Sequence, residues 1–216
     1  MSFYLGLISV ALVGILAQMY FGQRKNYKDS AKALVVKASC TFIPVLLCLY
    51  ALIITNAPVT KWLLFAGVFI CMAADVVIGI QFVAGMLTFL IAHLCFIAYF
   101  LTLAPFNGIS LIIFIVLYAC VARLFWRYVP TLGSRLIPFA VYPAALSLMF
   151  SIAVMLPFVL NSAGAVCIAV GAGLFVISDS ILADTTLGTV TQVKDRLIMY
   201  LYYPAVYLLA ISAFFM

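Results

Sequence analysis

Two aspartates, Asp75 and Asp179, lie inside long apolar runs, in a chain that has only five acidic residues and no glutamate. The runs are FAGVFICMAADVVIGI and VCIAVGAGLFVISDSILA. An ionised carboxylate in hydrocarbon costs roughly 2.5 to 3.5 kcal/mol on insertion scales, so each aspartate requires a partner, a proton or a task. Two carboxyl groups in different protonation states can act as an acid and a base. We therefore interpret the two residues as a candidate catalytic pair.

Other polar side chains in the apolar runs are candidates for binding a substrate beside this pair. They are Lys37, His93, Tyr142, Ser178, Tyr202 and Tyr203. Each residue type also has a structural alternative. A lysine near a membrane surface can snorkel to the interface, and tyrosines can form an interfacial belt. A lone histidine can be a hydrogen-bonded interior residue, and serines can bond to the backbone of their own helix.

Competing catalytic schemes lack their characteristic residues. A catalytic zinc site uses about three histidine or comparable ligands, and the chain has one histidine and six cysteines without a CxxC spacing. No GxSxG elbow and no glycine-rich phosphate loop occurs. The sequence thus implies no metal and no nucleotide cofactor, and water is the only co-substrate required.

The composition identifies the elements that must position these residues. Of the 216 residues 69% are apolar and 7% are charged, and the mean hydropathy is +1.36. A membrane core of about 30 Å requires about 20 helical residues per crossing. The sequence therefore predicts an all-α integral membrane protein that forms one domain over residues 1–216. Its eight predicted spans are approximately 2–22, 34–56, 61–80, 83–103, 108–126, 136–158, 161–183 and 196–216.

The net charge of +6 does not indicate nucleic-acid binding, because the basic residues fall at alternate loops. By the positive-inside rule, these loops face the cytoplasm and both termini lie on the non-cytoplasmic side. This orientation places Asp75 in the cytoplasmic third of its helix and Asp179 about one turn from the cytoplasmic end. The basic residues at these loops are Arg24, Lys25, Lys28 and Lys32, then Arg123, Arg127 and Arg135, then Lys194 and Arg196, and Lys61 alone borders an even-numbered loop.

Several segments resemble the YhhN-like family of lysoplasmalogenases, from about residue 34 to the end of the chain. They include LVVKASCTFIPVLL, AADVVIG, GMLTFLIAHLCFIAYF, GAGLFVISDSILA and LYYPAVYLLA. The most specific parts are Phe89-x-x-x-His93 and Ser178-Asp179-Ser180. The chain departs from the common family pattern at Ala38, Ala74 and Val206.

This resemblance implies an eight-helix membrane enzyme that hydrolyses the vinyl ether bond of lysoplasmalogens. The products are a fatty aldehyde and glycerophosphoethanolamine or glycerophosphocholine. Hydrolysis of an enol ether needs a proton delivered to carbon, an anion beside the oxocarbenium-like ion and a base for the attacking water, which suits Asp75 and Asp179 as catalytic residues. Mutual repulsion favours one protonated aspartate, and Lys37 favours ionisation of the other. The sequence does not indicate which of the two donates the proton.

Two alternatives to an enzyme use the same residues. In a proton-coupled transporter or lipid-binding membrane protein, the aspartates would carry protons or cations past a central substrate. A purely structural bundle would bind partner helices through its small residues, which buried acids on two helices argue against. The expected partners are a lysophospholipid substrate and membrane lipids. Short loops favour a multi-pass protein of the bacterial cytoplasmic (inner) membrane.

Overall fold

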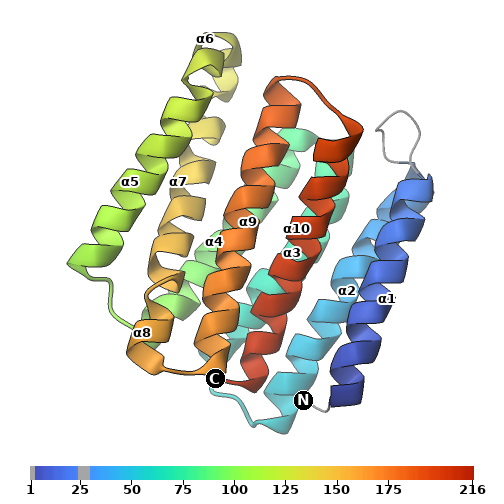
Figure 1. Cartoon of the computed structure of the whole chain (residues 1–216), viewed down its shortest axis with the longest axis vertical. Coiled ribbons are helices and arrows are strands. Elements are labelled where there is room, and N and C mark those ends of the chain that lie inside the picture. The colour runs from blue at the N-terminus through green and yellow to red at the C-terminus, as the bar shows by residue number, and fades with distance from the viewer. Residues whose placement is uncertain (1–2, 24–29) are drawn as a thin grey trace.

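The computed structural model describes residues 3–23 and 30–216, and all regular elements in these residues are helical (Figure 1). The long helices are α1 (Phe3–Gln23), α2 (Ala31–Ile54), α3 (Lys61–Ile80), α4 (Phe82–Leu103), α5 (Gly108–Phe125), α7 (Leu136–Ala153), α9 (Ala163–Leu187) and α10 (Gln192–Ile211). The short ones are η1 (Trp126–Tyr128), α6 (Val129–Leu132), η2 (Gly133–Arg135), α8 (Leu156–Leu160) and η3 (Ser212–Phe214).

Seven helical segments of the described residues are long and apolar enough to cross a membrane. One of them, Gly108–Leu160, is 53 residues long and contains both α5 and α7, which lie alongside each other in Figure 1. The predicted all-helical membrane bundle is therefore confirmed. That the chain crosses the membrane eight times, and that both termini lie on the non-cytoplasmic side, stay predictions.

Several helix ends differ from the predicted ones by four or five residues, and one of these differences concerns the helix that carries Asp179. It was predicted to end near residue 183, but α9 continues to Leu187. The hydroxyls of Thr185 and Thr186 both donate to the Leu182 carbonyl at 2.8 Å, so these polar residues are satisfied within the helix. Asp179 consequently lies about two turns, not one, from the helix end.

Side-chain caps define where four of the helices begin. The side chains of Ser30, Asn107, Ser162 and Thr191 accept hydrogen bonds from backbone N–H groups in the first turns of α2, α5, α9 and α10. Such caps satisfy N–H groups that have no partner inside the helix. They separate the long helices at short turns, so that successive helices pack as neighbours.

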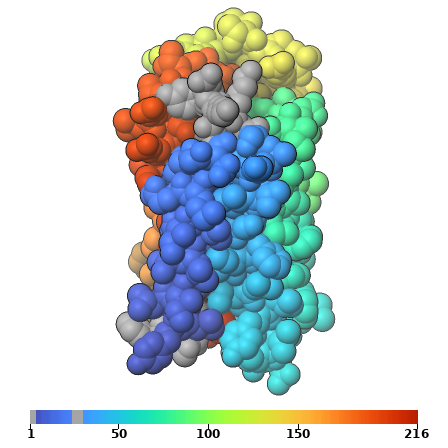
Figure 2. Space-filling model, turned by 90° about the vertical axis from the view of Figure 1, so that its right-hand side faces the viewer, coloured from blue at the N-terminus to red at the C-terminus, as the bar shows by residue number. Residues whose placement is uncertain are grey.

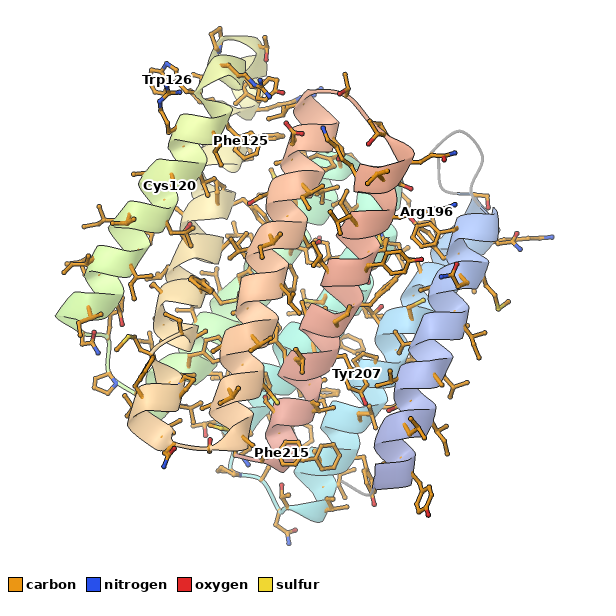
Figure 3. The ribbon with its side chains drawn as sticks, in the orientation of Figure 1. Cys120, Phe125, Trp126, Arg196, Tyr207 and Phe215 are labelled. Atoms are coloured by element: carbon orange, nitrogen blue, oxygen red, sulfur yellow. The ribbon has the colours of Figure 1, made fainter. Side chains whose placement is uncertain are left out.

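Helix α10 supplies many of the buried residues and packs against α9, α2 and α3. Close approach depends on small residues: a Cβ at Gly171 of α9 would lie 3.0 Å from the Ala205 carbonyl oxygen of α10. On the other side, α1 lies beside α2 (Figure 2). Helix α1 is also joined to α10 by a 2.7 Å hydrogen bond between Ser9 and Tyr207, the latter labelled in Figure 3.

Helix α5 lies at the edge of the bundle and has one buried residue, Ser110. Its main helix–helix contact is with α7. The turn that joins α5 to α7 contains η1, α6 and η2 and lies at the same end of the molecule as the α9–α10 turn (Figure 1). Ion pairs from Asp184 to Arg127 at 3.4 Å and to Lys194 at 2.6 Å connect these two turns.

This end of the bundle carries basic residues that the positive-inside argument assigned to the cytoplasm. Arg127, Lys194 and Arg196 lie there, with Arg196 labelled in Figure 3. Helix α1 ends and α2 begins at this end (Figure 1), whereas Arg24, Lys25 and Lys28 lie outside the described residues. Helix α1 begins and α10 ends at the opposite end (Figure 1).

Candidate functional site

Two cavities lie side by side near the end of the bundle that carries the basic residues. The first, here called the polar cavity, has a volume of about 420 Å³ and is lined by Lys37, Asp75, Asp179 and Asp195 together with hydroxyl and apolar side chains. The second, here called the apolar cavity, has a volume of about 360 Å³ and lies between α4, α5, α7 and α9. Both volumes fall within the range of about 300 to 1,000 Å³ that is usual for small-molecule sites.

The two cavities share one wall. Five residues line both of them: Ile78, Phe82, Phe89, Asp179 and Leu182. Asp179 is the only acidic residue among these five. Asp75 lines the polar cavity but not the apolar cavity. A molecule with a polar part and an apolar part can therefore occupy both cavities, with the point where its two parts join beside Asp179.

Asp75 has a cation and a hydroxyl donor as neighbours. The Tyr202 hydroxyl donates a hydrogen bond of 2.9 Å to Oδ2, and Lys37 Nζ lies 3.8 Å from Oδ1. Asp75 is 1% exposed and Lys37 4% exposed. A buried charge without a partner is strongly unfavourable, so the ammonium stabilises the ionised form of this carboxyl group.

Asp179 has different neighbours. Its Oδ2 accepts a hydrogen bond from the Tyr142 hydroxyl, which lies 3.1 Å from His93 Nε2. His93 is fully buried, and its Nδ1 has no hydrogen-bond partner among the described residues. In the described part of the chain, no lysine or arginine forms an ion pair with Asp179. The two carboxyl groups thus line one cavity in electrostatically unequal surroundings.

Aromatic rings pack against the polar side chains around both aspartates. Phe175 of α9 packs edge-on against Tyr202 at 5.4 Å and against His93 at 4.9 Å between ring centroids. Phe89 of α4 contacts both Phe175 and Tyr202 in the same geometry. Edge-to-face packing of this kind stabilises a specific arrangement of rings. It holds Tyr202, the donor to Asp75, and His93, the neighbour of Tyr142, in place without adding charge.

The remaining predicted site residues do not all reach the cavities. Ser178 lines the polar cavity, but its hydroxyl donates at 3.0 Å to the Ile198 carbonyl of α10. The suggestion that it bonds to its own helix is therefore wrong, whereas Ser180 does so, at 2.8 Å to Val176. Tyr203 is buried against the Tyr202 ring and is not part of either cavity lining. His93 reaches Asp179 only through Tyr142.

Sequence reasoning missed several residues of the polar cavity, namely Tyr20, Thr185, Thr186 and Asp195. Asp195 could have been noticed as one of only five acidic residues. Tyr20 is 1% exposed although α1 lies at the side of the bundle. In the apolar cavity, Phe125 and Trp126 form part of the lining at the α6 end of α5, where Figure 3 labels them.

No group of three or more His, Cys, Asp or Glu residues in the described ranges is placed to hold a metal ion. Comparison with known proteins gives one match: the model of the YhhN family matches residues 32–213. No curated protein and no solved structure matches the chain. The matched region includes both aspartates and most of the lining of both cavities, and it leaves out α1.

Proposed function

The chain belongs to the YhhN family, and we propose that it hydrolyses the vinyl ether bond of lysoplasmalogens. The observation that carries this proposal is the position of Asp179 on the wall between the apolar and polar cavities, with Asp75 lining the polar one. The products are a fatty aldehyde and glycerophosphoethanolamine or glycerophosphocholine. Short turns between the helices favour the bacterial cytoplasmic membrane as its location.

The two cavities suit a lipid with one tail. The apolar cavity of about 360 Å³ accommodates about a dozen groups of the size of a methylene, if each takes roughly the 30 Å³ of a water molecule. The polar cavity has Lys37 and Asp195 in its lining. It therefore suits a head group with a negatively charged phosphate and a positively charged amine. The vinyl ether connects tail to head, so it lies at the shared wall beside Asp179.

The different surroundings of the two aspartates support a different role for each. Asp179 has no ion pair in the described residues and also lines the tail side, so it is the protonated acid. Asp75, 3.8 Å from the Lys37 ammonium, is the ionised partner on the head side. This agrees with the substrate, because the carbon that receives the proton is the alkene carbon nearer to the tail. The Tyr142 hydroxyl can donate to the carbonyl oxygen of a protonated Asp179.

The reaction then proceeds in three steps. Asp179 transfers its proton to the tail-side alkene carbon, and the adjacent carbon and the ether oxygen share the positive charge. The Asp75 carboxylate stabilises this ion electrostatically and takes a proton from the water that attacks the charged carbon. The resulting hemiacetal is neutral, with Asp75 protonated and Asp179 ionised.

Collapse of the hemiacetal restores both carboxyl groups. The carbon–oxygen bond to glycerol breaks while Asp75 returns its proton to the leaving glycerol oxygen. Asp179 accepts the hydroxyl proton as the aldehyde carbonyl forms. The net reaction consumes one water and requires no other reactant, and the pair is ready for the next substrate.

The proposal is tested by aldehyde release from a lysoplasmalogen by the detergent-purified protein. Asp75→Asn and Asp179→Asn should each lower kcat by at least about a hundredfold, because positioned acid–base groups contribute about 10² to 10⁴. Asp184→Asn is the matched control, since Asp184 lines neither cavity and is paired at the surface. Full activity in both variants, or no aldehyde release from the unmodified protein, would contradict the proposal.

A further inference from the structure

The polar cavity contains an acidic residue that the proposed reaction does not use. Asp195, in the first turn of α10, lines this cavity together with Asp75 and Lys37. On the same helix, Tyr202 bonds to Asp75. Asp195 precedes Tyr202 by seven positions, which corresponds to about 10 Å along the helix axis. The cavity thus has acidic groups at two levels along α10.

This spacing corresponds to the length of a phosphoethanolamine head group. Nine bonds lead from the ether oxygen through glycerol and phosphate to the amine nitrogen. Nine bonds are also the backbone of three extended residues, which span about 10 Å. With the ether oxygen beside the two catalytic aspartates, the amine of an extended head group therefore reaches the level of Asp195.

A cation that suits a phosphate also lines the cavity. The Lys37 ammonium is on the wall, 3.8 Å from Asp75, whereas the Thr185 and Thr186 hydroxyls of α9 donate to the Leu182 carbonyl of their own helix and offer no free donor. A lysine can bind phosphate as a point charge. The lining therefore combines the catalytic carboxyl groups, the Lys37 cation and the Asp195 carboxylate, which is complementary to a substrate with an ether, a phosphate and an ammonium group.

We propose that Asp195 binds the amine of the substrate head group and makes the enzyme selective for lysoplasmalogens that carry one. The inference rests on the proposed function, because it takes the bound molecule to be a lysoplasmalogen. A primary ammonium offers three N–H donors to a carboxylate, and a quaternary ammonium offers charge alone. Selectivity should accordingly be greatest for the ethanolamine head group, smaller for choline and absent for a phosphate without an amine.

Asp195 could instead stabilise α10, because an acidic residue in the first turn of a helix interacts favourably with the helix dipole. The two roles give different results when head groups are compared at constant tail. The test measures kcat/KM of the purified protein on three lysoplasmalogens with the same alkenyl chain. Their head groups are phosphoethanolamine, phosphocholine and phosphate alone.

For Asp195→Asn, we expect the ratio of kcat/KM on phosphoethanolamine to that on phosphate alone to fall about fivefold, the size of a partly exposed ion pair. Asp184→Asn, the same substitution at the same end of the bundle, should leave this ratio unchanged. An equal loss on all three substrates would overturn the proposal in favour of helix stabilisation. An unchanged ratio would overturn it as well.

A binding measurement separates this inference from the proposed reaction. Glycerophosphoethanolamine should raise the thermal unfolding temperature of the unmodified protein more than glycerol 3-phosphate does, and Asp195→Asn should remove this difference. The measurement does not depend on turnover. Absence of any difference in the unmodified protein would overturn the amine site even if aldehyde release is observed, whereas a difference without aldehyde release would contradict only the reaction.

Discussion

Removal of one hydroxyl, in Tyr202→Phe, tests whether Asp75 acts as an ionised carboxylate. The Tyr202 hydroxyl donates to Asp75 Oδ2 at 2.9 Å, and the side chain is 4% exposed, so water does not readily replace the lost donor. A buried hydrogen bond to a charged group contributes about 2 kcal/mol, or roughly thirtyfold in kcat/KM. The phenylalanine ring keeps the edge-on contacts with Phe89 and Phe175, so the fold should be retained.

The neighbouring tyrosine provides a matched control. Tyr203 is 3% exposed, and its hydroxyl lies near the Cys40 thiol without a hydrogen bond of normal geometry. Tyr203→Phe should therefore leave aldehyde release nearly unchanged. Both variants are assayed with the same lysoplasmalogen and checked by thermal unfolding in detergent. Equal losses in the two variants, or full activity of Tyr202→Phe, would refute the assigned role of the Tyr202–Asp75 hydrogen bond.

Two further predictions concern the packing of the bundle and the length of the tail. In Gly85→Ala, the new Cβ would lie 2.3 Å from Ile78 Cα, and overpacking of about 2 kcal/mol should lower Tm by roughly 5 °C. Gly14→Ala has nothing within 4 Å of its Cβ and should not lower Tm. Ala140→Trp adds a large ring to the lining of the apolar cavity. It should lower kcat/KM for long alkenyl chains more than for short ones, and an equal effect on both lengths would count against a tail site there.

The long helices could be predicted from the sequence because the membrane requires continuous apolar runs. The span at 61–80 agrees with α3 at both ends. The end of α9 could not be predicted from hydropathy, because a hydropathy scale gives a threonine the same value whether or not its hydroxyl is bonded within the helix. Thr185 and Thr186 remain helical since each donates to the Leu182 carbonyl of its own helix.

The depth of the site residues could be predicted, but their partners could not. Counting residues from the helix ends places Tyr202 and Tyr203 at one level. Successive residues of a helix point about 100° apart, however, and only packing decides which one faces Asp75. Tyr202 donates a hydrogen bond to Asp75, and Tyr203 does not. Asp195 was missed because it lies between basic residues in a terminal turn, outside the apolar runs in which a charge attracts notice.

The unequal surroundings of the two aspartates follow from the order in which the helices pack. Helix α2 lies against α3 and places Lys37 beside Asp75, whereas α9 lies against α7, whose Tyr142 donates to Asp179. Tyr142 in turn contacts His93 of α4, which has no ion pair in the described residues. One carboxyl group therefore has a cation beside it and the other has hydroxyl and aromatic groups. Two like acids in one cavity can then hold one proton at a defined position, which an acid–base mechanism requires before the substrate arrives.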